Sequence, residues 1–355
     1  MEQSIANKEL NGPAAKPLLS IEDLQVSFHT YAGEVHAVRG VTYSVEQGGS
    51  LAVVGESGCG KTVTVQAVMR LTPMPPGKIK GGKIMFDGRD ILSLTEKQMQ
   101  SVRGKDIGMI FQDPMTGLNP TMTVGRQIAE AIVKHQHLSR GEATERAIEM
   151  LNMVEIPNPA VRATQYPHEF SGGMRQRAMI AIALACQPLL LIADEPTTSL
   201  DVTIQAQILE LLQSLQDKLG MTIVLITHNL GVVARLSRKI VVMYAGKVVE
   251  SGSSSDIFYH AAHPYTQALL QAVPRLDRPT RMELASIPGT PPDLFEPPKG
   301  CAFASRCKYS MKICLEQDAV PTQIGNGHHV SCWLHHAANP NPLTREFRNG
   351  GRVSD

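Results

Sequence analysis

The chain has 355 residues, of which 43% are hydrophobic and 19% charged, as in an ordinary globular protein with one large domain and a smaller appendage. The formal net charge of +1 at pH 7 gives no overall attraction to nucleic acid or to an acidic membrane surface. No run approaches the ~20 apolar residues that span a bilayer, and residues 1–16 lack the apolar centre of a signal peptide, so we expect a cytoplasmic protein.

The first part of the chain predicts strands and a Gly-rich turn. Residues 1–17 are polar and rich in Pro and Ala, and predict a flexible tail. Runs of β-type residues follow at 18–21, 41–45 and 50–54. The last run is almost continuously apolar, which is typical of a buried parallel strand. It ends in the Gly-rich turn, and a helical pattern covers residues 62–71.

The rest of the chain alternates between helical and strand patterns. Helical periodicity dominates residues 114–185, where Ser139 followed by Glu142 predicts a capping box. Strand patterns return, with a helix between the first two, at residues 189–193, 222–226 and 240–244. Apolar strands that alternate with helices predict an α/β fold with a mostly parallel sheet and a helical subdomain.

The composition shifts to Pro, His and Cys after about Gly252, which predicts a linker into a small, loop-rich and Cys-rich module. Four cysteines crowd into about thirty residues of that module. The resulting division is a tail at 1–17, a main domain at 18–252 with its helical part at about 114–185, a C-terminal region at 253–340 and a tail at 341–355.

Residues 55–62 read Gly-Glu-Ser-Gly-Cys-Gly-Lys-Thr and fit the phosphate-loop pattern G-x-x-x-x-G-K-[ST] between a predicted strand and a predicted helix. Glycines let backbone N–H groups surround phosphates, and the helix N-terminus adds partial positive charge. Lys61 can reach the β- and γ-phosphates, and the hydroxyl of Thr62 can bind Mg²⁺. The alternative, a plain strand-to-helix turn, does not explain this complete pattern, so we expect a nucleotide-binding loop.

Two carboxylates, Asp194 and Glu195, stand where the apolar strand at 189–193 leaves the sheet. Ligands of open α/β sheets bind at this end of the strands, where the phosphate loop also lies. Asp194 suits Mg²⁺, and Glu195 can act as a general base on water. Alone, such a pair is more often a helix cap or a solvated strand end, but beside a phosphate loop the catalytic interpretation is favoured.

Two further polar residues follow predicted strands at the same edge. The predicted strand at 222–226 is followed by Thr227 and then by His228. Gln112 follows Gly-Met-Ile-Phe at 108–111. An isolated histidine after a strand is usually a packing residue, and the spacing of Gln112 alone favours neither a functional nor a purely structural role. The neighbouring strand ends would direct both side chains to the γ-phosphate, the metal or the attacking water.

Residues 170–177 read Phe-Ser-Gly-Gly-Met-Arg-Gln-Arg and resemble the signature sequence of ABC-type ATPases, [LF]-S-G-G-x-x-[QR]. The same residues could simply open a helix whose arginines are solvated, yet a helix N-terminus is also an anion site. In the family this site serves the ATP held by the other subunit. The resemblance therefore implies a head-to-tail dimer in which each ATP lies between Lys61 of one subunit and Ser171 and Gly173 of the other.

The resemblance also implies a role for each matching position. Glu195, His228, Gln112 and Lys61 would act in catalysis, and Thr62, Gln112 and Asp194 would hold Mg²⁺. ATP in the same subunit would be bound by Gly55, Glu56, Ser57, Gly58, Cys59, Gly60, Lys61, Thr62 and Thr64. ATP of the other subunit would meet Ser171, Gly172, Gly173, Gln176 and Asp201, the last in the Ser199-Leu200-Asp201 loop. Tyr31 is the expected adenine-stacking residue, with Phe28 as the alternative.

A closer resemblance is to the ATPases of oligopeptide and dipeptide importers, over residues 17–335. It rests on residues 111–120, 193–207, 263–266 and 289–292, and on the cysteines that follow Gly300. Three positions depart from that branch: Gly117 stands where Ser is expected, Ser199 where Ala is commoner, and Asn229 where Asp usually follows the histidine. None of these removes a catalytic group, but Gly117 lies where a transmembrane partner would dock.

The clustered cysteines, Cys301, Cys307, Cys314 and Cys332, are separated by five, six and seventeen residues. Four thiolates suit zinc or an iron–sulfur cluster, and the C-x₂₋₄-C knuckle of most structural zinc sites is missing. The importer branch is associated with a [4Fe–4S] cluster, which the resemblance favours here as a structural element. A mixed zinc site with His328, His329, His335 or His336 and four unligated thiols are the alternatives.

The family implies ATP-driven closure of two cassettes, in which the helical subdomain passes the motion to membrane subunits. Expected partners are a second cassette, usually a paralogue, two transmembrane permease subunits and an extracytoplasmic peptide-binding protein, at the cytoplasmic face of the membrane. The same machinery importing nickel or another small solute is an alternative. An ABC-type ATPase of DNA repair or translation would usually have coiled-coil or zinc-finger insertions or a second cassette, which this sequence lacks. A non-catalytic cassette conflicts with the complete set of catalytic positions.

Overall fold

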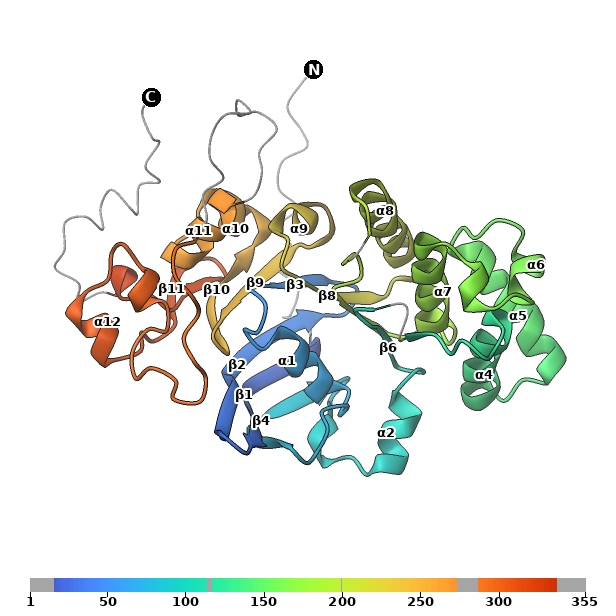
Figure 1. Cartoon of the computed structure of the whole chain (residues 1–355), viewed down its shortest axis with the longest axis horizontal. Helices are drawn as coiled ribbons and strands as arrows, with labels where there is room; N and C mark the ends of the chain where they lie inside the picture. Colours follow the sequence, from blue (N-terminus) through green and yellow to red (C-terminus); the bar gives the residue numbers. More distant parts are fainter. Residues whose placement is uncertain (1–15, 114–116, 199, 273–286, 337–355) are drawn as a thin grey trace, which may run out of the picture.

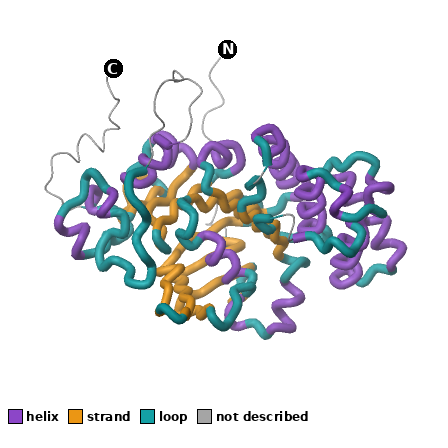
Figure 2. The backbone as a smooth tube through the Cα atoms, in the orientation of Figure 1, coloured by secondary structure: helices purple, strands orange, loops and turns teal. Residues whose placement is uncertain are grey.

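The computed structural model describes residues 16–113, 117–198, 200–272 and 287–336. Within them the chain forms two sheets flanked by helices (Figures 1 and 2). The strand order is β11-β12-β10-β9-β3-β8-β7-β6 in the eight-stranded sheet and β2-β1-β4-β5 in the four-stranded sheet. The predicted α/β class, with an antiparallel region beside a mostly parallel sheet, is confirmed.

The parallel part of the large sheet consists of β9 (Lys239–Tyr244), β3 (Ser50–Val54), β8 (Thr222–Thr227), β7 (Leu190–Asp194) and β6 (Ile107–Ile110). Every residue of β3, β6, β7 and β8 is buried. Both faces of these strands are therefore covered, which is why their sequences are continuous apolar runs without the alternation of a half-exposed strand.

The smaller sheet is antiparallel, with β1 (Pro17–Thr30) between β2 (Gly33–Glu46) and β4 (Gly77–Phe86), and β5 (Arg89–Asp90) at the edge. The predicted strand runs at 18–21 and 41–45 are parts of two 14-residue strands. The register of β1 shifts between Ile21 and Leu24, where Asp23 has a φ of 46°. This irregularity hides the strand's length because it breaks the alternation of polar and apolar residues.

Each face of the large sheet has its own cover. One buried cluster joins the small sheet and α1 (Lys61–Val68) to side chains of β3, β7 and β8. Another joins α9 (Leu230–Leu236), α10 (Ser254–Tyr259) and α11 (Pro264–Ala272) to side chains of β3 and β9. Figure 1 shows α8 (Val202–Leu219) beside α9 along the same side, while α2 (Glu96–Val102) lies on the side of the small sheet.

The predicted helical subdomain contains α4 (Val124–Gln136), α5 (Arg140–Met153), α6 (Pro159–Ala163) and α7 (Gly172–Leu184), and forms one end of the molecule in Figure 1. The capping box at the start of α5 is present: Glu142 N–H donates to Ser139 Oγ at 3.3 Å, and Ser139 N–H donates to Glu142 Oε2 at 2.9 Å. Helix α7 packs on these helices and on β6, so it joins the subdomain to the sheet.

The C-terminal region returns to the large sheet. Strand β10 (Lys247–Ser253) pairs with β9, α10 starts at the next residue, and β12 (His328–Val330) pairs with β10 and with β11 (Thr322–Gly325). Directly after Gly252, where the predicted linker begins, the chain forms the last residue of β10 and then α10. The remaining elements are η3 (Ala304–Arg306), α12 (Lys312–Glu316) and η4 (Trp333–His335). The domain boundaries themselves stay a prediction.

Among the described residues, none of the helices combines the length and apolar character that crossing a membrane requires. Of the predicted tails, residues 1–15 of the first and all of 341–355 lie outside the described residues. Residues 114–116, at the start of the predicted helical range, and Ser199 also lie outside them.

Candidate functional site

The phosphate-loop sequence forms the connection between β3 and α1. Gly55, Gly58 and Gly60 have φ values of 155°, 79° and 95°, a backbone region that side chains other than glycine rarely adopt. A Cβ on Gly60 would lie 2.4 Å from the carbonyl oxygen of Ala37. Ser57 and Gly58 are exposed at the tip of the loop, which is the surface a phosphate would meet. Cys59, by contrast, is buried beneath it.

Lys61 lies in the first turn of α1 and bends back along the loop. Its Nζ donates hydrogen bonds to the carbonyl oxygens of Gly55 at 2.8 Å and Glu56 at 3.0 Å. The residue is only 4% exposed, so these contacts fix the position of its charge within the loop. Its ammonium is therefore held where the loop would enclose a ligand.

Thr62 and Asp194 meet across the end of the sheet, because α1 starts beside the last residue of β7. The Thr62 hydroxyl donates to Asp194 Oδ1 at 3.1 Å. The pKa of the Asp194 carboxyl is raised to about 6, mainly by burial and also by the charge of Glu195, against the lowering effects of the Thr62 hydrogen bond and the Lys61 charge. A bound cation would reverse this balance, because it stabilises the ionised carboxylate.

Glu195 follows β7 with a φ of 47°, and three side chains converge on its carboxylate. Gln112 Nε2 donates to Glu195 Oε2 at 3.2 Å, the Thr198 hydroxyl donates to the same oxygen at 2.9 Å, and His228 Nδ1 lies 3.4 Å from it. The Glu195 side chain is 10% exposed and the His228 side chain 52%. The structure thus brings together the predicted Gln112, Glu195 and His228. Thr198 was missed in the sequence, because a threonine three residues after Glu195 belongs to no motif that would indicate a contact with this carboxylate.

Thr64 lies elsewhere than its predicted role suggests. Its hydroxyl donates to the carbonyl oxygen of Gly60 at 2.8 Å, and the residue is fully buried. It therefore closes the first turn of α1 from within the protein. The contact supports the geometry of the loop but gives the threonine no exposed group for a nucleotide.

The signature residues begin α7, far from α1 in Figure 1. Ser171 is exposed and caps the helix, its Oγ accepting the N–H of Met174 at 3.4 Å. Gly172 is also exposed, and Gly173 is partly buried against Ile204. Gln176 is buried, and its Nε2 has no hydrogen-bond partner among the described residues. Because α1 and α7 lie apart, the phosphate loop and the signature of one chain are not positioned around a common ligand.

Asp201 caps α8 through a hydrogen bond from the N–H of Ile204 to its Oδ1, at 3.0 Å. Ser171 and Asp201 therefore occupy equivalent positions at the starts of neighbouring helices. Ser199, predicted to belong to the same loop as Asp201, lies outside the described residues.

The structure separates the two candidate adenine-stacking residues. Tyr31 lies in the turn between β1 and β2, and its side chain is completely exposed. Phe28 lies within β1 and packs on the buried cluster of the small sheet. Only Tyr31 offers a free ring face, so it is the better candidate of the two.

Cys301, Cys307, Cys314 and Cys332 line one cavity of the C-terminal region, together with His263, Phe303 and Trp333. The thiols are reduced, and burial raises the pKa of Cys301 to about 11 and that of Cys332 to about 12. Such values describe buried neutral thiols, and a bound metal would lower them.

Among the described residues, no three His, Cys, Asp or Glu side chains are grouped so that they could hold a metal ion. The grouping of these side chains therefore supports neither the predicted [4Fe–4S] centre nor the zinc alternative among the described residues. Of the four histidines that could have joined it, His328 and His335 are engaged elsewhere: His328 Nε2 contacts Glu250 and His335 Nε2 contacts the carbonyl of Ala262.

Two residues from the C-terminal region contact the phosphate loop and were missed in the sequence. Tyr265 Oη accepts the N–H of Glu56 at 2.8 Å, and the Arg306 guanidinium contacts the Glu56 carboxylate at 2.8 and 3.1 Å. They lie 209 and 250 residues after Glu56. No local pattern connects such distant positions.

Comparison with protein families gives two matches. The family model described as "ABC transporter" matches residues 38–198, and the one described as "Oligopeptide/dipeptide transporter, C-terminal region" matches residues 249–314. The first range contains the phosphate loop, the signature and both strand-end carboxylates. The second contains Tyr265, Arg306 and the first three clustered cysteines.

Among curated proteins, the chain is 57% identical to the oligopeptide transport ATP-binding protein OppD of Bacillus subtilis strain 168, over 91% of this chain and 90% of that protein. It is 53% identical to the dipeptide transport ATP-binding protein DppD of the same strain, over 89% and 94%. Among solved structures, the dimeric ATP-binding cassette MJ0796 in a post-hydrolysis state with ADP and Pi superimposes with a TM-score of 0.60 at 26% identity. The match covers 66% of this chain and 98% of that one.

Proposed function

The chain belongs to the ATP-binding subunits of ABC transporters, in the branch of the oligopeptide and dipeptide transport proteins, and we propose that it energises the import of peptides across a membrane. It is an ATPase. The observation that supports a working catalytic site is the convergence of Gln112, Thr198 and His228 on the Glu195 carboxylate, next to the loop that holds Lys61.

We assign the hydrolytic roles from these contacts. Lys61 neutralises charge on the β- and γ-phosphates. Glu195 takes a proton from water as the water oxygen bonds to the γ-phosphorus; the bond from this phosphorus to the bridging oxygen breaks, and ADP and phosphate result. His228 and Gln112 orient Glu195 and the water. Thr62, Asp194 and Gln112 would hold Mg²⁺, which neutralises phosphate charge when bound. Thr64 is left out of the ligand-binding set because its fully buried hydroxyl donates to the carbonyl oxygen of Gly60.

The active unit in this proposal is a head-to-tail pair of cassettes. The N-terminus of α7 presents an exposed Ser171 and Gly172, and α7 lies apart from α1, the helix that follows the phosphate loop, in Figure 1. A phosphate bound there would lie at a helix N-terminus, which favours anions. Asp201 at the start of α8 would lie at the same interface. The cassette MJ0796, similar in fold, is itself described as a dimer.

The four cysteines would hold a [4Fe–4S] cluster rather than one zinc ion. Each iron of such a cluster binds one thiolate, so its ligands need not meet at a single point. The four thiols that line a common cavity would supply these thiolates. The cluster would stabilise a region whose elements are short, and no step of ATP hydrolysis passes through it.

The proposed partners follow from the branch to which the chain belongs. They are a second cassette, for which a paralogue suits the family better than an identical copy, and two permease subunits that contain the transmembrane helices. An extracytoplasmic peptide-binding protein would act through these permeases. The chain would associate with the cytoplasmic face of the membrane, and the helical subdomain would contact the permeases there.

The test is uptake by cells in which Lys61→Ala replaces the chain, measured with a labelled dipeptide, a labelled pentapeptide and nickel ion. We expect one or both peptide signals to disappear while nickel uptake persists. The control is Lys97→Ala, which removes an exposed lysine of α2 and should leave all three signals unchanged. Peptide uptake that persists in the Lys61→Ala cells would show that peptides are not the cargo, and loss of nickel uptake alone would favour the nickel alternative.

A further inference from the structure

Glu56, the second residue of the phosphate loop, is held from two sides by the C-terminal region. Its backbone N–H donates to Tyr265 Oη at 2.8 Å. Its two carboxylate oxygens accept from the two terminal nitrogens of Arg306 at 2.8 and 3.1 Å. The pair is bidentate, and the Arg306 side chain is only 5% exposed, so the interaction is directional and little screened.

The same peptide contacts the lysine of the loop. Lys61 Nζ donates to the carbonyl oxygen of Glu56 at 3.0 Å and to that of Gly55 at 2.8 Å. A displacement of the Glu56 peptide would therefore displace the acceptors that fix the ammonium of Lys61. Contacts at Glu56 act on the charge that meets the phosphates.

Arg306 is itself rigidly placed. Its guanidinium also donates to Tyr244 Oη at 3.1 Å and to the carbonyl oxygens of Ile287 and Pro288 at 3.2 and 2.8 Å. Burial lowers the pKa of this guanidinium, but the hydrogen bonds to Glu56 and Tyr244 raise it overall. With five acceptor atoms from four residues around one planar group, the side chain has little freedom to follow a moving loop.

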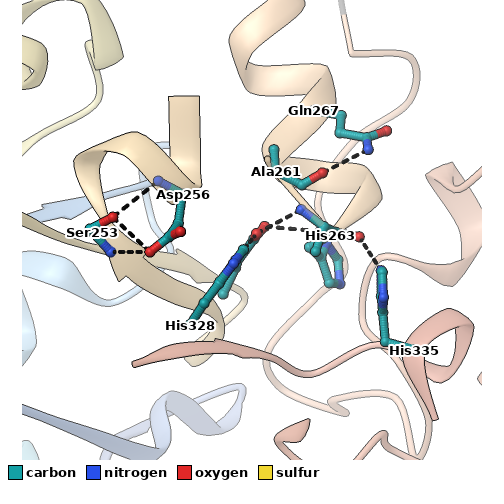
Figure 3. A network of polar contacts seen from close by, with 9 residues as sticks. Ser253, Asp256, Ala261, His263, Gln267, His328 and His335 are labelled. Carbon is teal, nitrogen blue, oxygen red and sulfur yellow. Dashed lines mark hydrogen bonds and ion pairs between the residues drawn. The ribbon is translucent and has the colours of Figure 1, made fainter. Parts of the chain in front are cut away.

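Tyr265 is equally constrained. Its ring is fully buried between Tyr244 and Phe303, with centroids 4.6 and 5.4 Å away. The start of α11 is fixed by a polar network to which His263 and His328, labelled in Figure 3, belong. The buried Glu250 accepts the N–H groups of Ala262 and His263 at 2.7 and 2.9 Å.

That network reaches both Tyr265 and the last strand of the region. His263 Nδ1 accepts the N–H of Tyr265 at 3.0 Å, and His328 Nε2 of β12 contacts the Glu250 carboxylate at 2.8 Å. The tyrosine that holds the loop is therefore anchored to β10, β12 and the helix start together. This anchoring gives the hydroxyl a fixed position before any nucleotide binds.

We propose that the C-terminal region positions the phosphate loop for nucleotide binding, with Tyr265 and Arg306 as positioning residues that act through Glu56 on Lys61. The inference rests on the proposed role of the loop in binding ATP. It assigns to the C-terminal region a function in the ATP site of its own chain. Loss of either contact would let the Glu56 peptide move and would weaken the binding of nucleotides.

A purely structural role would look different. The ion pair of Lys247 with Asp318 also attaches the C-terminal region to the sheet, and both of its partners lie outside residues 55–62 of the phosphate loop. Lys247→Met therefore weakens this attachment without touching Glu56. It is the matched control for a change in the Tyr265 or Arg306 contact.

The experiment measures the Kd of ADP by calorimetry and the kcat and KM for ATP, with the full-length chain and its Tyr265→Phe, Arg306→Met and Lys247→Met variants. We expect a Kd about three- to tenfold higher in Tyr265→Phe, which removes one hydroxyl, and about tenfold or more in Arg306→Met. The KM should rise in parallel while kcat changes less than twofold. Lys247→Met should bind ADP as the unsubstituted chain does, even where its thermal unfolding temperature falls.

A double-mutant cycle tests the route through Glu56. If Arg306 acts through the Glu56 carboxylate, Glu56→Gln combined with Arg306→Met should raise the Kd no more than the larger single effect. Additive effects would overturn this route, and wild-type affinity in a folded Tyr265→Phe chain would overturn the inference. An unsubstituted chain that fails to bind ADP would instead contradict the proposed function. Should Arg306→Met fail to fold, Tyr265→Phe decides alone.

Discussion

Gln112 and Glu195 are joined by a hydrogen bond of 3.2 Å from the Gln112 amide to the Glu195 carboxylate, although they are 83 residues apart. The contact links the residues that follow β6 and β7, which are parallel neighbours. It holds the carboxylate at the edge of the sheet where the phosphate loop also lies. A loop movement around Gln112 would therefore reach the proposed base directly.

Glu195→Gln should abolish turnover while leaving nucleotide binding intact. The amide cannot take a proton from water, so we expect ATP hydrolysis to fall about 10²- to 10⁴-fold, measured as phosphate release. Since the Lys61 contacts are unchanged, the variant should still bind ATP. Closed dimers should then accumulate, and gel filtration would detect them. Hydrolysis at the unsubstituted rate would show that another group is the base.

Ser171 allows helix capping to be separated from ligand binding. Ser171→Ala removes the cap of α7 and should destabilise the chain by about 1 kcal/mol. Ser171→Asp keeps the cap and suits the helix dipole, so its stability should be retained, but its charge would repel the phosphates of the partner's ATP. We expect Ser171→Asp to bind ADP normally while ATP-dependent dimerisation and hydrolysis fall at least tenfold. Full activity of a folded Ser171→Asp chain would place the partner's ATP elsewhere.

The adenine-stacking role of Tyr31 is tested by comparing ADP with inorganic tripolyphosphate, which has no adenine ring. Since its ring is fully exposed, Tyr31→Ala should change the free energy of unfolding by no more than about 0.5 kcal/mol. Loss of base stacking should weaken ADP binding about tenfold, while binding of inorganic tripolyphosphate should stay unchanged. Phe28→Ala is the comparison, because Phe28 packs on the core and its truncation should lower stability. Unchanged ADP affinity in Tyr31→Ala would leave the adenine with a different partner.

The local parts of the site could be predicted from the sequence. The glycines that precede Lys61 and the two acids that end β7 are contiguous motifs, and the geometry of a parallel sheet brings them to one edge. The side chains of Gln112 and His228 contact Glu195 for the same reason. The hydrogen bond from the Thr64 hydroxyl to the Gly60 carbonyl could not be predicted, because a position in a helix turn does not reveal which way a hydroxyl points.

The C-terminal contacts could not be predicted in this way. Composition indicated a separate module, whereas β12 pairs with β10 and Arg306 meets Glu56. A strand of three residues such as β12 has no periodicity to detect. A bidentate ion pair also leaves no trace in a single sequence, since any arginine and glutamate could form it. Tertiary packing alone decides which of them meet.

The cysteine cavity can be tested by metal analysis of protein prepared without oxygen. A [4Fe–4S] cluster predicts roughly four irons and four acid-labile sulfides per chain. Cys307→Ser should lower both values and the thermal unfolding temperature. Cys186→Ser is the control, since Cys186 is a buried thiol whose Sγ lies 3.6 Å from the carbonyl oxygen of Ala131, in the helical subdomain. One zinc per chain without iron would establish the alternative, and absence of both would mean that the thiols are unligated.

His263 gives the folded chain a predictable dependence on pH. Burial lowers the pKa of its imidazole to about 4, although Glu250 opposes this and His335 adds to it. In the unfolded chain the pKa is about 6.5. As the pH falls from about 6.5 to 4, the His263 imidazole takes up a proton in the unfolded chain but stays neutral in the folded chain. Stability present above pH 6.5 is therefore lost, at up to about 1.4 kcal/mol per pH unit.

The measurement compares urea unfolding of the unsubstituted chain and His263→Asn at pH 7, 6 and 5. Asparagine keeps an acceptor for the N–H of Tyr265 but does not titrate, while Glu250, His328 and His335 remain in both proteins. Relative to His263→Asn, the unsubstituted chain should therefore lose about 1–2 kcal/mol of unfolding free energy between pH 7 and 5. His329→Asn, a change at an exposed position of β12, should leave the pH dependence unaltered. Parallel curves for His263→Asn and the unsubstituted chain would mean that the imidazole takes up its proton in the folded state, with the network of Glu250 rearranged around the new charge.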